Sequence, residues 1–209
     1  RALAIQPTVL LLDEPLSALD AKVRSRLRDE IRRVQLEVGT TTLFVTHDQE
    51  EALAIADRVG VMNAGRLEQL DSPVAIYSRP ATPFVAEFVG LTNRLEGTVR
   101  DGQVEVRGVR LPLVKSDMAD GAAVALVRPE AVSLGPDEDS VPGPLTGTVI
   151  TVAFLGATSR VSVDLGDMTV LAQLPTAQAS AYPAGTRVRL AIRPDPVLIA
   201  REEKAPVEA

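Results

Sequence analysis

The stretch that decides the fold class is residues 9–20, VLLLDEPLSALD, in which an apolar run leads directly into acidic and small side chains. The run at residues 9–12 is continuous rather than alternating, which favours a strand buried on both faces of a parallel sheet. Asp13 and Glu14 stand at the carboxyl end of that strand, where ligands bind in open α/β sheets. Two adjacent carboxylates there need a cation, a hydrogen-bond donor or water to offset their desolvation.

Two interpretations of this acidic pair are open on the residues alone. In one, a magnesium ion bridged to nucleotide phosphates neutralises the carboxylates. In the other, Asp13 caps the next helix and Glu14 is solvated. The single histidine, His47, ends a second apolar run at residues 41–46. A lone histidine at a strand end is more often structural, but beside the acidic pair it can hydrogen-bond a phosphate or an attacking water.

The segments between and after these runs predict helices. Asp20 is placed to cap the start of a helix over residues 21–38, and Gly39 its end. Asp48 starts a second helix, and residues 58–70 are typical of a hairpin. Strand, helix, strand and helix in this order imply a parallel α/β layer. The apolar face of the first helix comprises Val23, Leu27, Ile31, Val34 and Val38.

Residues 94–200 change to short Val-, Gly- and Pro-rich runs between turn signals, which predicts an all-β region. Two segments recur: LEGTV at 95–99 returns as LTGTV at 145–149, and VALVRPE at 124–130 returns as VRLAIRPD at 188–195. Two related β-units that close one small barrel would explain the repeat. The matching turns contain Arg128 and Arg193. In one interpretation these arginines bind an anion; in the simpler one they form salt bridges that fix the shape of the turns.

We therefore expect three segments: residues 1–90 as an α/β part, 91–200 as an all-β part and 201–209 as a frayed, charged tail. The junction between the two folded parts is expected at residues 90–93, with residues 135–144 as a loop inside the second.

The composition excludes several classes of function. The 209 residues are 45% hydrophobic and 24% charged, the ordinary globular range. The absence of cysteine and the single histidine exclude thiolate and multi-histidine metal sites. Net charge is −6, and neither part is basic, which argues against a nucleic-acid surface. No apolar run reaches the roughly 18–20 residues of a membrane span.

Several of these segments together resemble the ATPase subunits of ATP-binding cassette (ABC) transporters. Residues 11–20, LLDEPLSALD, resemble their Walker B segment and D-loop, and residues 45–52, VTHDQEEA, resemble the switch-histidine segment of bacterial importers. Residues 1–3 resemble the end of the helix after the ABC signature motif, and residues 76–90 the linker into a regulatory domain. The repeated β-region resembles the transport-associated OB-type domain of importers for polyamines, ferric iron, sulfate or sugars.

The resemblance implies part of a P-loop NTPase domain with a parallel sheet, followed by an all-β, OB-like barrel. It implies ATP and Mg²⁺ as cofactors. Asp13 would hold magnesium through water, Glu14 would act as general base and His47 would contact the γ-phosphate. Ser17 and Asp20 would belong to the nucleotide-binding set and couple the site to a partner subunit across an ATP-sandwich dimer.

The implied function is that of the ATP-binding subunit of a bacterial importer, an ATPase that couples hydrolysis to solute uptake. Such a subunit is peripheral at the cytoplasmic face of the cell membrane. Its implied partners are a second copy, transmembrane permease subunits and, indirectly, a periplasmic or lipid-anchored solute-binding protein, with no nucleic acid. The junction at residues 90–97, GLTNRLEG, favours a polyamine or ferric iron importer.

The chain departs from the family pattern in three motifs. It contains no G-x-x-x-x-G-K-[ST] phosphate loop, no Gln-containing loop before Walker B and no signature motif. In the family all three lie upstream of the position that Arg1 occupies. With the missing initiator Met, this favours a C-terminal fragment.

Two other functions stay open on the residues. One is an OB-type regulatory module that binds a small anion or metabolite without catalysis, which calorimetry of residues 91–209 with oxyanions and polyamines would detect. The other is a metal-dependent phosphohydrolase built on Asp13 and Glu14, which lacks the further carboxylate and histidine ligands that such sites need.

We predict that the 209-residue chain by itself neither binds nor hydrolyses ATP appreciably. In the family, the phosphate loop supplies most of the backbone N–H donors that hold nucleotide phosphates. This sequence contains no phosphate loop. Isothermal titration calorimetry with Mg-ATP and a phosphate-release assay check this expectation. Tight ATP binding by the purified chain would contradict it.

Overall fold

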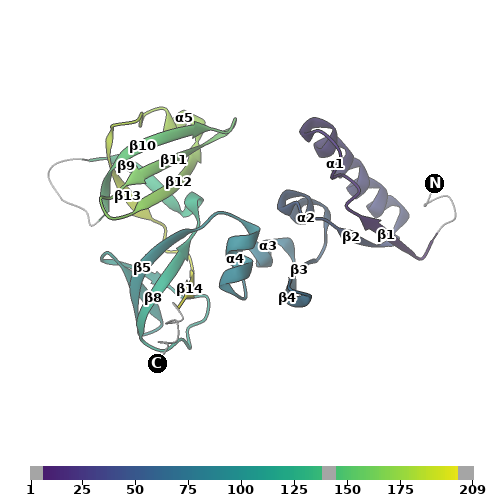
Figure 1. The fold of residues 1–209 in the computed structure, drawn as a ribbon, viewed down its shortest axis with the longest axis horizontal. Coiled ribbons are helices and arrows are strands. Elements are labelled where there is room, and N and C mark those ends of the chain that lie inside the picture. Colours follow the sequence, from purple (N-terminus) through teal and green to yellow (C-terminus); the bar gives the residue numbers. More distant parts are fainter. Residues whose placement is uncertain (1–6, 138–144, 202–209) are drawn as a thin grey trace, which may run out of the picture. The chain divides into compact units, whose positions relative to one another are not determined.

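The computed structural model describes residues 7–137 and 145–201, and the chain divides into two compact units, Arg1–Ala81 and Thr82–Ala209 (Figure 1). The sequence places the junction near residue 90, whereas the units divide after Ala81. The difference comes from helix α4 (Pro83–Val89), whose Ala86 is buried among strand residues of the second unit. The helix end expected at 1–6, most of the 135–144 loop and the tail at 202–209 lie outside the described residues.

The first unit begins with two strands that pair in parallel, β1 (Val9–Asp13) and β2 (Thr41–Val45), in the register Val9↔Thr41 to Asp13↔Val45. Helix α1 (Ala21–Val38) connects them. Helix α2 (Gln49–Ile55), the hairpin β3–β4 (Val59–Asn63 and Arg66–Asp71) and helix α3 (Pro73–Ser78) follow.

The expectation of a first strand buried on both faces is wrong. Val9 and Leu11 of β1 lie with Leu43 of β2 on one face of the sheet, and all three side chains are exposed. The physical reason is that, within the described ranges, this sheet has only two strands. The first unit therefore presents an apolar sheet face to solvent.

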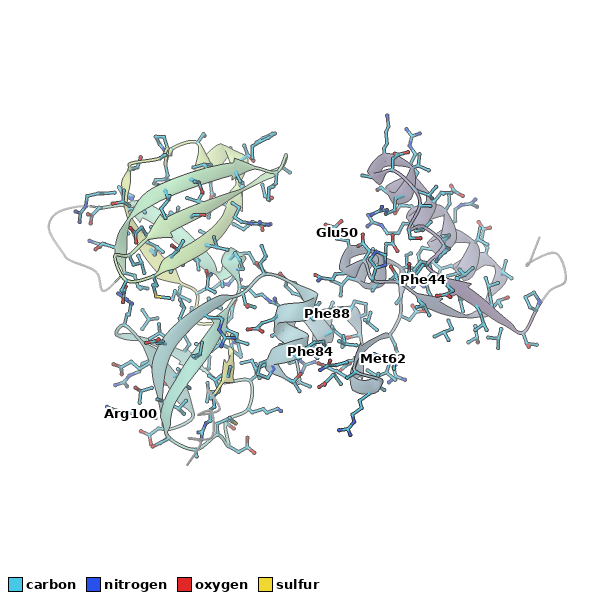
Figure 2. All side chains as sticks on the ribbon, viewed as in Figure 1. Phe44, Glu50, Met62, Phe84, Phe88 and Arg100 are labelled. Atoms are coloured by element: carbon cyan, nitrogen blue, oxygen red, sulfur yellow. The ribbon has the colours of Figure 1, made fainter. Side chains whose placement is uncertain are left out.

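The predicted helix boundaries are confirmed by their caps. The Asp20 carboxylate accepts hydrogen bonds from the N–H groups of Lys22 and Val23, and Gly39 ends α1 in the left-handed region at φ 66°. Asp48 caps α2 in the same way. The hydroxyls of Ser72 and Thr82 cap α3 and α4, each followed by proline. Phe84 and Phe88 stack on α4, with ring centroids 5.5 Å apart (Figure 2).

After helix α4 the second unit is mostly β, as predicted for residues 94–200, with two five-stranded antiparallel sheets. A short 3₁₀ turn (Pro129–Ala131) precedes β9, and the short helix α5 (Thr176–Ala179) follows β12. The strands are β5 (Asn93–Arg100), β6 (Gln103–Val106), β7 (Val109–Pro112), β8 (Gly121–Val127), β9 (Val132–Pro136), β10 (Thr146–Phe154), β11 (Thr158–Asp164), β12 (Thr169–Pro175), β13 (Arg187–Ile192) and β14 (Leu198–Ala200).

The two sheets correspond to the two sequence repeats, with their last strands exchanged. One sheet has the order β7-β6-β5-β8-β14, and the other has the order β12-β11-β10-β13-β9. Strand β9 follows β8 in the chain but pairs with β13, while β14 follows β13 but pairs with β8. A single buried apolar cluster includes residues of both sheets. The repeat therefore builds two interlocked sheets around one core rather than one sheet closed on itself.

The glycine shared by both LxGTV segments has a steric reason. A Cβ at Gly97 would lie 2.6 Å from the carbonyl oxygen of Glu105, and one at Gly147 would overlap the carbonyl oxygen of Asp164. In each sheet, the strand that follows the hairpin turn passes so close to this glycine that no side chain fits there.

The two repeated Arg-Pro turns differ in their contacts. Arg193 forms an ion pair with Asp195 at 2.6 Å, whereas Arg128 donates hydrogen bonds to the carbonyl oxygens of Ala86 and Leu91.

The side chain of Asn93 joins the two sheets. It is only 4% exposed at the start of β5. Its amide nitrogen donates to the carbonyl oxygen of Leu171 at 2.9 Å, and its amide oxygen accepts from the Leu171 N–H at 2.7 Å. The amide thus pairs with the edge of β12 as a backbone strand would.

We expect Asn93→Ala to lower the free energy of unfolding of the second unit by about 2–4 kcal/mol, because two hydrogen bonds are lost and the two partly buried backbone groups of Leu171 lose these partners. Urea unfolding of the full chain, followed by circular dichroism, measures the change. Glu96→Ala, at an exposed position in the same strand, is the matched control and should stay within about 0.5 kcal/mol of wild type. Equal stabilities of the two variants would contradict the role of Asn93.

Candidate functional site

The candidate site lies where β1 and β2 end side by side. Asp13 pairs with Val45, and the N–H of Glu14 donates to the carbonyl oxygen of Val45 at 2.9 Å, one residue beyond the strand. Glu14 then adopts φ 42°, in the left-handed region that is uncommon for residues other than glycine. The chain therefore turns sharply at the acidic pair, and backbone conformations of this kind cluster at functional sites.

The turn brings Glu14 to the histidine that follows β2. The Nδ1 atom of His47 lies 3.2 Å from Oε1 of Glu14, although the two residues are far apart in sequence. The side chains are 72% and 47% exposed, so both are accessible to a ligand. With Nδ1 directed at the carboxylate, Nε2 of His47 is left to contact another group. The structure thus places Glu14 of the acidic pair beside the histidine, while the roles of these residues stay predictions.

Asp13 supplies a second exposed carboxylate at the same strand end. Among residues 7–137 and 145–201, no group of three or more His, Cys, Asp or Glu side chains is placed to hold a metal ion. One carboxylate suits a hydrated magnesium ion that takes its other oxygen ligands from water and phosphate, because Mg²⁺ in nucleotide sites is bound by one or two carboxylates. The residues present therefore fit that ion.

Ser17 and Asp20 take part in local structure next to the site. The Ser17 hydroxyl donates to the carbonyl oxygen of Glu14 at 3.0 Å, which closes the turn after β1. Leu16 lies buried under that turn. Asp20 caps α1 through its carboxylate. Their predicted contacts with a partner subunit stay predictions.

A buried acidic residue behind His47 was not singled out from the sequence. Glu51 is 3% exposed and accepts a hydrogen bond from the Thr46 hydroxyl at 2.6 Å, and Thr46 in turn accepts from the N–H of Asp48 at 3.0 Å. The Arg24 guanidinium reaches Asp48 at 3.2 Å and Glu51 at 3.7 Å. These contacts fix both residues that flank His47. The D-x-x-E spacing of Asp48 and Glu51, a capping-box pattern, was the available signal.

A second ion pair ties α1 to the segment after α2. The Arg32 guanidinium hydrogen-bonds the Asp57 carboxylate, and this contact lowers the pKa of Asp57 and raises the pKa of Arg32. Both the hydrogen bond and the charge of Arg32 favour the ionised carboxylate. Together with Arg24, this pair anchors α2, and with it the histidine segment, to the helix that begins at Asp20.

The comparisons with known proteins confirm the resemblance seen in the sequence. Residues 125–199 match the family model described as "TOBE domain", which falls within the second unit. The chain is homologous to the ATP-binding subunits of ABC importers. Among the described residues, no helix is both long and apolar enough to cross a membrane.

The relatives are named for particular transport systems. The sulfate/thiosulfate import ATP-binding protein CysA of Xanthomonas campestris pv. campestris is 48% identical over 92% of this chain and 55% of its own length. The spermidine/putrescine import ATP-binding protein PotA of Thermobifida fusca is 44% identical over 93% of this chain and 54% of its own length. The chain thus spans about half the length of these relatives. The solved structure of the cytoplasmic molybdate-binding protein ModG aligns with a TM-score of 0.43 and 21% identity, covering 52% of this chain and 94% of that one.

We expect Glu51→Ala to lower the free energy of unfolding of the first unit by about 2–3 kcal/mol, because the Thr46 hydroxyl loses its buried acceptor and the Arg24 guanidinium loses one of its two ion-pair partners. Urea unfolding measures the loss, and the NMR signals of the His47 ring should shift with it. Glu50→Ala, the exposed neighbour in the same helix turn, is the control and should cost less than about 1 kcal/mol. A similar cost for both variants would rule out the supporting role of Glu51.

Proposed function

We propose that this chain belongs to the ATP-hydrolysing subunit of a bacterial importer and holds the Asp13, Glu14 and His47 part of its catalytic site. The observation that carries the proposal is the 3.2 Å contact between Glu14 and His47 at the paired ends of β1 and β2. A carboxylate and an imidazole that are open to solvent, at the carboxyl end of parallel strands, form a site suited to a bound phosphate and water.

Each residue has a proposed task. The Glu14 carboxylate accepts a proton from the water that attacks the γ-phosphate, since a general base must reach that water by a hydrogen bond. His47, oriented by Glu14 through Nδ1, directs Nε2 at the γ-phosphate and stabilises the charge that develops there. Asp13 is the residue that would hold a magnesium ion, which would supply positive charge beside the phosphates.

Ser17 and Asp20 have a proposed role in the coupling between two subunits. Both lie on the segment from the site to α1, since Ser17 contacts the Glu14 carbonyl oxygen and Asp20 caps the helix. A displacement of α1 would therefore reach Glu14 through the short backbone segment between Asp20 and Ser17 and the Ser17–Glu14 hydrogen bond. We include in the proposal an ATP-dependent homodimer, transmembrane permease subunits, an indirectly linked solute-binding protein and a place at the cytoplasmic face of the membrane.

The proposed solute is sulfate or thiosulfate. The relative of 48% identity carries that name, and its similarity includes 92% of this chain. The sequence at 90–97 favours a polyamine or ferric iron instead. A polyamine is the second candidate, because the spermidine/putrescine relative is 44% identical over 93% of this chain.

We expect Glu14→Gln, made in the intact subunit, to reduce ATP turnover at least 100-fold while leaving ATP affinity within about threefold of wild type. The amide keeps the shape of the side chain but cannot accept the proton of the attacking water. Steady-state phosphate release and nucleotide titration separate the two effects.

The matched control for this experiment is Glu50→Gln, which changes an exposed glutamate at the start of α2. It should leave turnover unchanged. Near-normal turnover in Glu14→Gln would remove Glu14 from the mechanism, and loss of ATP binding in that variant would assign it to binding rather than to catalysis.

A further inference from the structure

Arg24, near the start of α1, joins the two chain segments that form the candidate site. Its Nη2 atom donates to the carbonyl oxygen of Leu19 at 2.9 Å. On the other side, Nη1 donates to the Asp48 carboxylate at 3.2 Å, and Nε lies 3.7 Å from Oε1 of Glu51. One guanidinium group therefore links the segment that leaves β1 to the segment that leaves β2.

The His47 ring has little support of its own. It is 72% exposed, and within the described ranges its one polar contact is the approach to Glu14 at 3.2 Å. An exposed side chain with a single contact takes its direction largely from its backbone. The next residue, Asp48, is held by Arg24 through its carboxylate and by the Thr46 hydroxyl through its N–H. The direction of the His47 ring therefore depends on Arg24.

A guanidinium group suits this position because its donors are fixed in one planar fork that can reach several acceptors at once. Glu51 is a buried carboxylate, which needs a cation beside it. Nε of Arg24 is also buried, and it makes no hydrogen bond in the part of the chain that the structure describes. A buried donor without an acceptor favours any movement that brings Glu51 closer. The contact thus draws the histidine segment toward residues 16–20.

We propose that Arg24 is a positioning residue, which holds His47 in the direction that its contact with the γ-phosphate requires. The inference rests on the proposed function, because only that function gives His47 a phosphate to contact. Arg24 touches neither phosphate nor water in this scheme and acts through His47 alone. A shift of Leu19 moves the guanidinium group, and with it Asp48 and the histidine. The turn that follows β1 thereby regulates the histidine that follows β2.

The first experiment measures kinetics in the intact subunit. Arg24→Met removes the fork and should lower ATP turnover about tenfold or more, while the KM for ATP stays within about threefold, because a misdirected group costs rate more than binding. Arg24→Lys keeps the charge beside buried Glu51, so its folding is protected, but a single ammonium group cannot span the three acceptors. It should show the same split, with a loss of about threefold or more.

The matched control is Arg26→Met, which changes an exposed arginine of the same helix and should keep wild-type turnover. Circular dichroism checks that each variant is folded. Wild-type turnover in Arg24→Lys would overturn the inference, and so would a rise in KM that accounts for the whole loss.

A double-mutant cycle shows whether Arg24 acts through His47. His47→Gln should itself lower turnover, and Arg24→Lys added to it should cost less than about twofold more, because two changes that act through one group are not additive. A full further loss in the double variant would overturn the inference. Unchanged turnover in His47→Gln alone would contradict the proposed function instead, so the two failures give different results.

A third measurement is independent of ATP hydrolysis. His47 is the single histidine of the 209-residue chain, so its ring gives one set of NMR signals. Glu14→Gln changes the group that the ring contacts and provides the reference for a lost contact. Arg24→Lys, which keeps the charge of Arg24, should move the ring signals toward that reference, whereas Arg26→Met should not. Ring signals that stay at their wild-type positions in Arg24→Lys would overturn the inference.

Discussion

The hydrogen bond from the N–H of Glu14 to the carbonyl oxygen of Val45 extends the parallel pairing of β1 and β2 by one residue, and the geometry of the candidate site depends on it. Parallel strands hold their carboxyl ends at the same edge of a sheet, so residues that leave these strands begin at neighbouring points. Glu14 leaves by a left-handed turn, and His47 leaves two residues after Val45. The contact between their side chains follows from the register, because a slip of one residue would turn Glu14 to the other face.

In the second unit, two related β-repeats share a single apolar core. Exchange of β9 and β14 makes each sheet incomplete without the other repeat. Asn93 adds a polar link between the sheets, and it is buried where an unpaired amide would be costly. Cooperative folding of the whole unit is the expected consequence, because neither repeat contains all the strands of its own sheet.

Local features of this chain were predictable from sequence, and pairing across the chain was only partly so. The caps at Asp20 and Asp48 were predictable, because a cap needs only a side-chain oxygen beside a helical pattern. The neighbourhood of Glu14 and His47 followed from the order of strands and helices. The exchange of β9 and β14 was not predictable, since short Val-rich runs do not encode which strand they pair with. Glu51 reads as one of two adjacent glutamates, and only the packing of Arg24 and Thr46 shows that it is buried.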